Sequence, residues 1–221
     1  EGKPTDPQRF DEVDLMEREA SYGRSGFALQ FMLDTTLSDL EKYPLKLNDL
    51  VVVSGLSTWK EAPAKIQWAS STDQIKNIDS ELPNVGLKGD YYVAPMYMSE
   101  EYAPFEGSVM AIDPAGRGAD RTGFAVVKML HGILYVTACG GLIGGYSDST
   151  LEELSTIAKH QNVNYVVLES NFGDGMATAL LKPIMARIHP CSIEEARHSK
   201  QKELRIIDTL EPVMNQHRLV V

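Results

Sequence analysis

The chain has 221 residues, 43% of them hydrophobic, and it carries 31 acidic against 21 basic residues for a formal net charge of −10. No apolar run approaches the roughly 20 residues of a membrane-spanning helix, and the polar, acidic start predicts no signal peptide. The two cysteines stand outside any C-x-x-C pattern, which disfavours a structural zinc site or a disulfide framework. We therefore expect a globular protein in a reducing cytoplasm, one that could contact nucleic acid only through a local basic face.

The first hundred residues predict helices and short strands followed by irregular chain. Helical spacing predicts helices over 7–23 and 25–37, with Gly23 as the stop between them. Short strands are predicted at 49–55 and 64–70. Proline, glycine and tyrosine without a clear period then predict irregular chain over 81–107, so we place a domain boundary after Glu106.

Residues 107–221 predict a more regular domain. Strands are predicted at 109–113, 124–130 and 133–138, and His131-Gly132 forms a two-residue hairpin turn between the last two. A loop is predicted over 140–146.

Helices then alternate with strands. Ser149 with Glu152 three residues later predicts a capping box at the start of a helix. The run over 164–170 is continuously apolar, which is typical of a strand buried on both faces. The remaining predictions are a helix bent at Pro183, a strand at 190–195, a helix over 200–217 and a strand at 218–221. The order β-β-β-α-β-α-β-α-β predicts an α/β fold, a mixed sheet with helices on both faces.

Two acids stand at strand ends, where sites of open α/β sheets form. Asp113 and Glu169 each end an apolar strand, and a turn containing glycine follows each of them. If the two strands are neighbours, their carboxylates meet at one edge and offer hard oxygen ligands for Mg²⁺ or Mn²⁺. The alternative is that both acids only cap turns or helices.

Other polar residues are secondary candidates. Asp120 lies in the glycine-rich turn and Asp174 precedes a helix, and structural roles explain both positions. On a helix, His198, Lys202 and Arg205 share one face that could bind phosphates, although such a charge run is usually a solvated surface. Lys200 and Arg117 are weaker candidates for the same contact.

Several enzyme classes have no motif here. The sequence contains no G-x-x-x-x-G-K-[ST] phosphate loop, no G-x-S-x-G elbow and no H-E-x-x-H zinc motif. The glycine-rich turn after Asp113 leads into a strand rather than a helix, which disfavours a dinucleotide-binding fold.

Three separated segments resemble one protein family: "AIDPAGRGADRTGFAVV", "VVLESNFGDGM" and "KELRIIDTLEPVMNQHRLVV". They are similar to the nuclease domain of the large terminase subunit of short-tailed double-stranded DNA phages. The segment "YGRSGFALQFMLDTTLSDLEKYPLKL" resembles the part of that subunit that joins its ATPase motor to its nuclease.

This resemblance implies an RNase H-like nuclease that cuts concatemeric double-stranded phage DNA during packaging, in the host cell cytoplasm. It implies two divalent metal ions, Mg²⁺ or Mn²⁺, with Asp113 and Glu169 as catalytic metal ligands. It also implies a portal protein, a small terminase subunit and a ring oligomer as partners, and no membrane. Residues 1–106 would be a linker or extension and 107–221 the nuclease domain. The family's third acid would then lie beyond residue 221, so we expect the chain to be part of a longer protein and a poor nuclease by itself.

Two other interpretations remain open. An actin-like or sugar-kinase ATP-binding domain has a similar fold, although no glycine-rich adenosine loop is recognisable here. A non-catalytic packaging module with a vestigial site is the second. ATP binding would favour the former, and a lack of Mn²⁺ binding near Asp113 the latter.

Overall fold

The structure is a computed structural model that describes residues 4, 6–33, 44–68, 76–77, 86, 91–115, 120–169, 175–197 and 201–221. The chain divides into two compact units, Glu1–Leu45 and Lys46–Val221. In the described part of the first unit, one helix, α1 (Glu12–Phe31), covers the positions where the sequence predicts the end of one helix and the start of another; residues 34–37 of the second predicted helix lie outside the described residues. A glycine inside a helix costs only about 1 kcal/mol, and the helix formers on both sides outweigh it, so the predicted stop at Gly23 is wrong.

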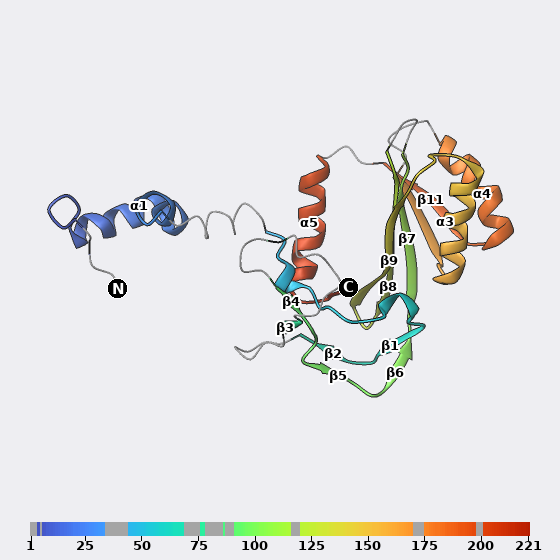
Figure 1. The fold of residues 1–221 in the computed structure, drawn as a ribbon, viewed down its shortest axis with the longest axis horizontal. Helices are drawn as coiled ribbons and strands as arrows, with labels where there is room; N and C mark the ends of the chain where they lie inside the picture. Colours follow the sequence, from blue (N-terminus) through green and yellow to red (C-terminus); the bar gives the residue numbers. More distant parts are fainter. Residues whose placement is uncertain are drawn as a thin grey trace. The chain divides into compact units, whose positions relative to one another are not determined.

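The second unit is built on a six-stranded mixed sheet with the order β11-β10-β7-β8-β9-β12 (Figure 1). Its strands are β7 (Gly107–Asp113), β8 (Thr122–Leu130), β9 (Ile133–Leu142), β10 (Tyr165–Glu169), β11 (Ser192–Ala196) and β12 (Leu219–Val220). The first three form an antiparallel meander. β10 pairs in parallel with both β7 and β11, and β12 pairs in parallel with β9. Every strand predicted after residue 106 is present.

The hairpin between β8 and β9 turns at His131 and Gly132, as predicted. Their φ angles are 49° and 78°, and a two-residue type I′ turn requires positive values at both positions. β9 continues to Leu142, where it pairs with Thr122, so the loop predicted at 140–146 begins later than expected.

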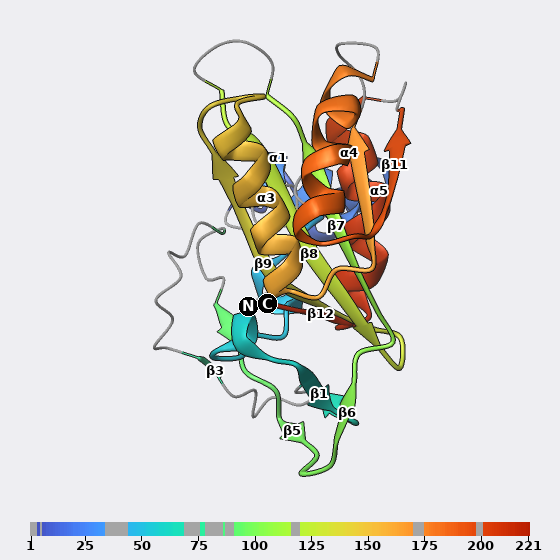
Figure 2. The ribbon, with the colours of Figure 1, turned by 90° about the vertical axis from the view of Figure 1, so that its right-hand side faces the viewer.

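Three α-helices of this unit flank the sheet: α3 (Asp148–His160), α4 (Met176–Ile188) and α5 (Lys202–Asn215). α3 and α4 cover one face and α5 lies on the other, as two perpendicular views show (Figures 1 and 2). The predicted order of elements and the predicted helices on both faces are confirmed. The predicted capping box at Ser149 is wrong, because Ser147 is the N-cap residue and accepts the backbone N–H of Thr150.

The main core lies between the sheet and helices α3 and α4. Alternate residues of the strands point into it, so Met110 and Ile112 of β7 and Val166 and Leu168 of β10 are buried. The helices contribute Leu151, Leu154, Ala158, Ala177, Leu181 and Met185. β10 therefore has one buried and one half-buried face, rather than the two buried faces predicted from its apolar run. The less buried face of β7 and β10 looks toward α5.

Residues 46–106 pack against the same sheet. They contain the 3-10 helices η1 (Leu47–Asp49) and η2 (Leu56–Thr58) and three antiparallel pairs of short strands. The pairs are β1 (Glu61–Pro63) with β6 (Tyr102–Pro104), β2 (Ile66–Gln67) with β5 (Tyr97–Met98), and β3 (Lys76–Asn77) with β4 (Tyr92–Val93). Three of these strands lie in the stretch predicted to be irregular.

A second buried cluster joins this segment to the sheet. Val51 forms isolated bridges with Val93 and Val220 instead of the strand predicted over 49–55. The cluster consists of Val51, Leu56, Ala62, Leu130, Tyr135 and Val220. The compact units thus divide at Leu45, and the domain boundary expected after Glu106, which lies inside the second unit, stays a prediction.

Candidate metal centre

Asp113 and Glu169 lie side by side at one edge of the sheet. β7 and β10 are adjacent and parallel, and their register pairs Ile112 with Leu168, so the next residue of each strand is an acid. Neighbouring strands lie about 4.8 Å apart. Because side chains alternate along a strand, both acids point away from the buried Ile112 and Leu168, toward the face that carries α5. The condition set by the sequence, that these two strands are neighbours, is therefore met.

A recess of about 300 Å³ opens in front of the two carboxylates. Its floor includes small residues from β7, β8 and β11, namely Ala111, Gly123, Ala125 and Ala196. Gly123 pairs directly with Asp113, and a Cβ atom there would lie 3.9 Å from the Cβ of Asp113. Because these residues have small side chains or none, the space beside the two carboxylates stays open.

The first turn of α5 brings a cation to each carboxylate. The Lys202 ammonium donates to Asp113 Oδ2 at 2.6 Å, and the Arg205 guanidinium donates to Glu169 Oε1 at 3.1 Å. The Lys202 pair is open to water, with side chains 58% and 52% exposed, whereas those of the Arg205 pair are only 22% and 17% exposed. The hydrogen bond and the charge of Asp113 raise the pKa of Lys202 above its usual value. Lys202 and Arg205 were predicted as phosphate contacts, and their pairing with the acids was not foreseen.

The other predicted site residues are less informative. Asp120 is exposed just before β8. Asp174, Lys200, Arg117 and His198 lie outside the described residues. A residue that sequence reasoning passed over is Glu194 of β11, which pairs with Val167 and so shares the face of Glu169. Its position could be recognised only once the register of β10 and β11 was known.

The donor set fits a hard divalent cation. The carboxylates of Asp113 and Glu169 converge on an open recess. Lys202 and Arg205 balance their negative charge in this structure, and a bound metal ion would do the same. Within the described ranges, no group of three or more His, Cys, Asp or Glu side chains is arranged to hold a metal. An ion held here would therefore take two protein carboxylates and complete its shell with water, as Mg²⁺ commonly does.

The sheet order, the flanking helices and the strand-end acids define an RNase H-like domain. Residues 112–219 match the model of the family described as "Terminase Bacteriophage T7, Ribonuclease H-like domain", and they belong to this terminase family. The large terminase subunit of Enterobacteria phage T3 is 48% identical over all 221 residues. The chain spans 37% of the length of that relative.

Solved terminase nucleases are similar at much lower identity. The Mn-soaked, inhibitor-bound nuclease domain of the human cytomegalovirus terminase is 12% identical, with 52% of this chain and 62% of that chain covered and a TM-score of 0.40. The large terminase nuclease of the thermophilic phage G20c is 17% identical, with 52% and 57% covered and a TM-score of 0.40. Separately, none of the helices in the described part of the chain has the length and hydropathy needed to cross a bilayer.

Proposed function

We propose that this chain is the nuclease part of a phage large terminase subunit and that it hydrolyses phosphodiester bonds of double-stranded DNA during genome packaging. The observation that carries the proposal is the pair of carboxylates, Asp113 and Glu169, at the ends of two adjacent parallel strands. The near relationship to the T3 large terminase subunit supports the same conclusion. The substrate is concatemeric phage DNA in the cytoplasm of the host cell.

Two divalent ions, Mg²⁺ or Mn²⁺, would act here: Asp113 and Glu169 together would hold the first, and the second would need an acid beyond this pair. Bound ions of this kind lower the pKa of water and stabilise the leaving oxygen of a phosphodiester. The chain's own contribution is rigidity, because the sheet fixes both carboxylates in one register. Asp120 and Asp174 are the next acids to consider if one of the pair proves dispensable.

The basic face of α5 would hold the DNA backbone. Once the carboxylates bind metal, Lys202 and Arg205 can turn to the phosphates that flank the scissile bond. Lys200 and Arg117 would extend this contact. Binding of this type reads no bases and weakens steeply with salt.

The partners follow from the role of a large terminase subunit. They are double-stranded DNA, the portal protein and the small terminase subunit, with a ring of large subunits on the capsid. None of these contacts involves a membrane.

Plasmid cleavage in Mn²⁺ by a protein extended beyond residue 221 tests the proposal, because the 221-residue chain alone is expected to be a poor nuclease. Asp113→Asn and Glu169→Gln should each reduce cleavage by about 100-fold or more, because each removes a charged ligand. Glu153→Gln, which neutralises an exposed acid on α3, is the matched control and should cut normally. The melting temperature should be nearly unchanged for Asp113→Asn, whose pair with Lys202 is largely exposed, and should fall for Glu169→Gln, which breaks the less exposed pair with Arg205.

Two results would count against the proposal. Cleavage by the Glu169→Gln protein at the normal rate would remove that residue from the mechanism and shift attention to Asp120 and Asp174. If the extended protein neither binds Mn²⁺ near Asp113 nor cuts DNA, the domain is an assembly module without chemistry.

A further inference from the structure

A second, larger cavity lies at the other end of the sheet. Its volume is about 730 Å³, and it opens beside the start of β7, among η2, β6, β8 and the end of α3. Gly107 lines this cavity whereas Asp113 lines the metal-site recess, and six residue-to-residue steps along β7 separate them by about 20 Å. The cavity is thus separate from the proposed nuclease site, and ligand binding in it does not depend on nuclease activity.

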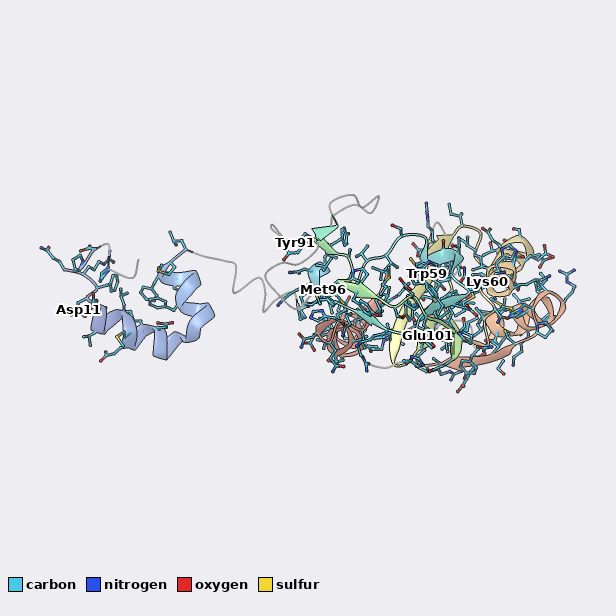
Figure 3. The ribbon with its side chains drawn as sticks, turned by 90° about the horizontal axis from the view of Figure 1, so that it is seen from below. Asp11, Trp59, Lys60, Tyr91, Met96 and Glu101 are labelled. Atoms are coloured by element: carbon cyan, nitrogen blue, oxygen red, sulfur yellow. The ribbon has the colours of Figure 1, made fainter. Side chains whose placement is uncertain are left out.

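The cavity is basic although the chain is acidic. Lys60, Lys128 and His160 line it, and no Asp or Glu does so among the residues that the structure describes. The whole sequence, by contrast, has a net charge of −10. Trp59 and Lys60 come directly after η2 and are both labelled in Figure 3. A concave site lined by cations without acids favours an anion.

Lys128 is the central observation. Its side chain is on β8, directly opposite Ser108 of β7, and the residue is only 6% exposed. The ammonium donates one long hydrogen bond, 3.4 Å, to the carbonyl of Trp59 and lies 5.1 Å from the ring centre of Phe105. No carboxylate in the described part of the chain forms a salt bridge with it, and burial lowers its pKa. A buried ammonium without a counter-charge is costly, and a bound anion would supply that charge.

Two further polar atoms at the cavity have no hydrogen-bond partner in the described residues. They are Ser108 Oγ and Gln161 Oε1, and both are buried. The amide nitrogen of Gln161 is engaged by the carbonyl of Ser57 at 3.1 Å, so its oxygen needs a donor from elsewhere. A ligand that carries N–H or O–H groups as well as an anion would satisfy it, which an inorganic phosphate cannot do as fully.

The size and walls of the cavity narrow the ligand class. A volume of about 730 Å³ is in the usual range for small-molecule sites and exceeds what a bare phosphate needs. Trp59 and Phe105 offer aromatic surface, while Asn162 and Asn164 add amide groups. We propose that this cavity binds a nucleoside phosphate, with Lys128 and Lys60 on the phosphate and the aromatic and amide side chains around the nucleoside.

A nucleoside phosphate could reach this cavity either as a free nucleotide or as the terminal nucleotide of a DNA strand. Titration calorimetry on the complete 221-residue chain separates them, with EDTA present so that no metal bridges ligands to Asp113. The ligands are inorganic phosphate, dAMP, and a short oligonucleotide with either a 5′-phosphate or a 5′-hydroxyl. We expect dAMP to bind more tightly than phosphate, with a Kd of about 1 mM or lower. A preference for the 5′-phosphorylated oligonucleotide over dAMP would identify the strand end as the source.

Variants connect the binding to the cavity. Lys128→Met keeps the volume and removes the charge, and it should weaken dAMP binding by about tenfold or more, as expected when a charge-assisted hydrogen bond is lost. Lys60→Ala changes an exposed residue, so it should leave the fold intact, and it should weaken binding by about threefold. Lys65→Ala, an exposed lysine outside the cavity, is the matched control and should bind normally. The proposal is overturned if dAMP does not bind, if phosphate binds as tightly as dAMP, or if neither Lys128→Met nor Lys60→Ala changes binding.

Discussion

The contact between Lys202 and Asp113 predicts that a single substitution tightens metal binding. The ammonium lies 2.6 Å from Asp113 Oδ2, so an ion that uses this oxygen must displace it. Lys202→Met keeps most of the side-chain length and removes the charge. The variant should therefore bind Mn²⁺ more tightly than the unaltered protein, although it has lost an ion pair.

The size of the effect depends on the exposure of the pair. Its side chains are 58% and 52% exposed, and such surface ion pairs stabilise a protein by about 0.2–1 kcal/mol. In the Lys202→Met variant this pair is absent, so metal binding no longer has to break it. A displaced ammonium that stays about 5 Å from a divalent ion repels it by about 1.7 kcal/mol in water, or about 1 kcal/mol after screening by 0.1 M salt. Together these contributions amount to about 1.2–2 kcal/mol, which predicts Mn²⁺ affinity higher by a factor between about 8 and about 30.

Calorimetric titration of Mn²⁺ measures this change, with Lys182→Met on the exposed side of α4 as the control. The gain should shrink to the contribution of direct repulsion, about fivefold, when Lys202→Met is made in the Asp113→Asn background, because no ion pair with Asp113 is then left to break. Equal or weaker Mn²⁺ binding by Lys202→Met, with an unchanged melting temperature, would refute the reasoning.

Three further outcomes are expected from the structure. Arg205→Met should destabilise the fold more than Lys202→Met, by about 1–3 kcal/mol in urea unfolding, because its pair with Glu169 is far less exposed; equal effects would contradict this. Met110→Ala, at a fully buried core position, should cost about 2–5 kcal/mol in the same assay, and a loss under about 1 kcal/mol would mean that the core closes around the gap. Burial raises the pKa of Tyr135 from 10.0 to about 12, so its contribution to stability is complete below pH 10 and is lost as the pH rises toward 12. Ultraviolet titration should show this late-ionising tyrosine in the folded protein, and Tyr135→Phe should remove it.

The regular half of the fold could be predicted because its local patterns agree with its tertiary structure. A short apolar run specifies β7, and the dipeptide His131-Gly132 suits the positive φ angles of a tight hairpin. The pairing of Asp113 with Glu169 was predictable from one general property, that the carboxyl ends of adjacent parallel strands meet at one edge.

Other features of the fold could not be predicted, because two local patterns compete for the same position or because the feature depends on residues far apart in sequence. Two serines fit the start of α3, and only the structure shows that Ser147 rather than Ser149 caps it. The helix propensity of α1, summed over its twenty residues, outweighs the cost of Gly23, so the helix continues past this glycine. The packing of Val51 against β12 joins positions far apart in sequence, which no local pattern encodes.

The pairing of Lys202 and Arg205 with the two carboxylates gives these cations a role that a basic helix face alone does not suggest. They lie 89 and 36 residues further along the chain than the acids they contact. The same ammonium and guanidinium cannot neutralise carboxylates and DNA phosphates at once. In the proposed nuclease, a metal ion at the acids would therefore release the two cations that the incoming phosphates require. Metal and DNA would then bind cooperatively through one exchange of counter-charges, without any rearrangement of the sheet that holds Asp113 and Glu169.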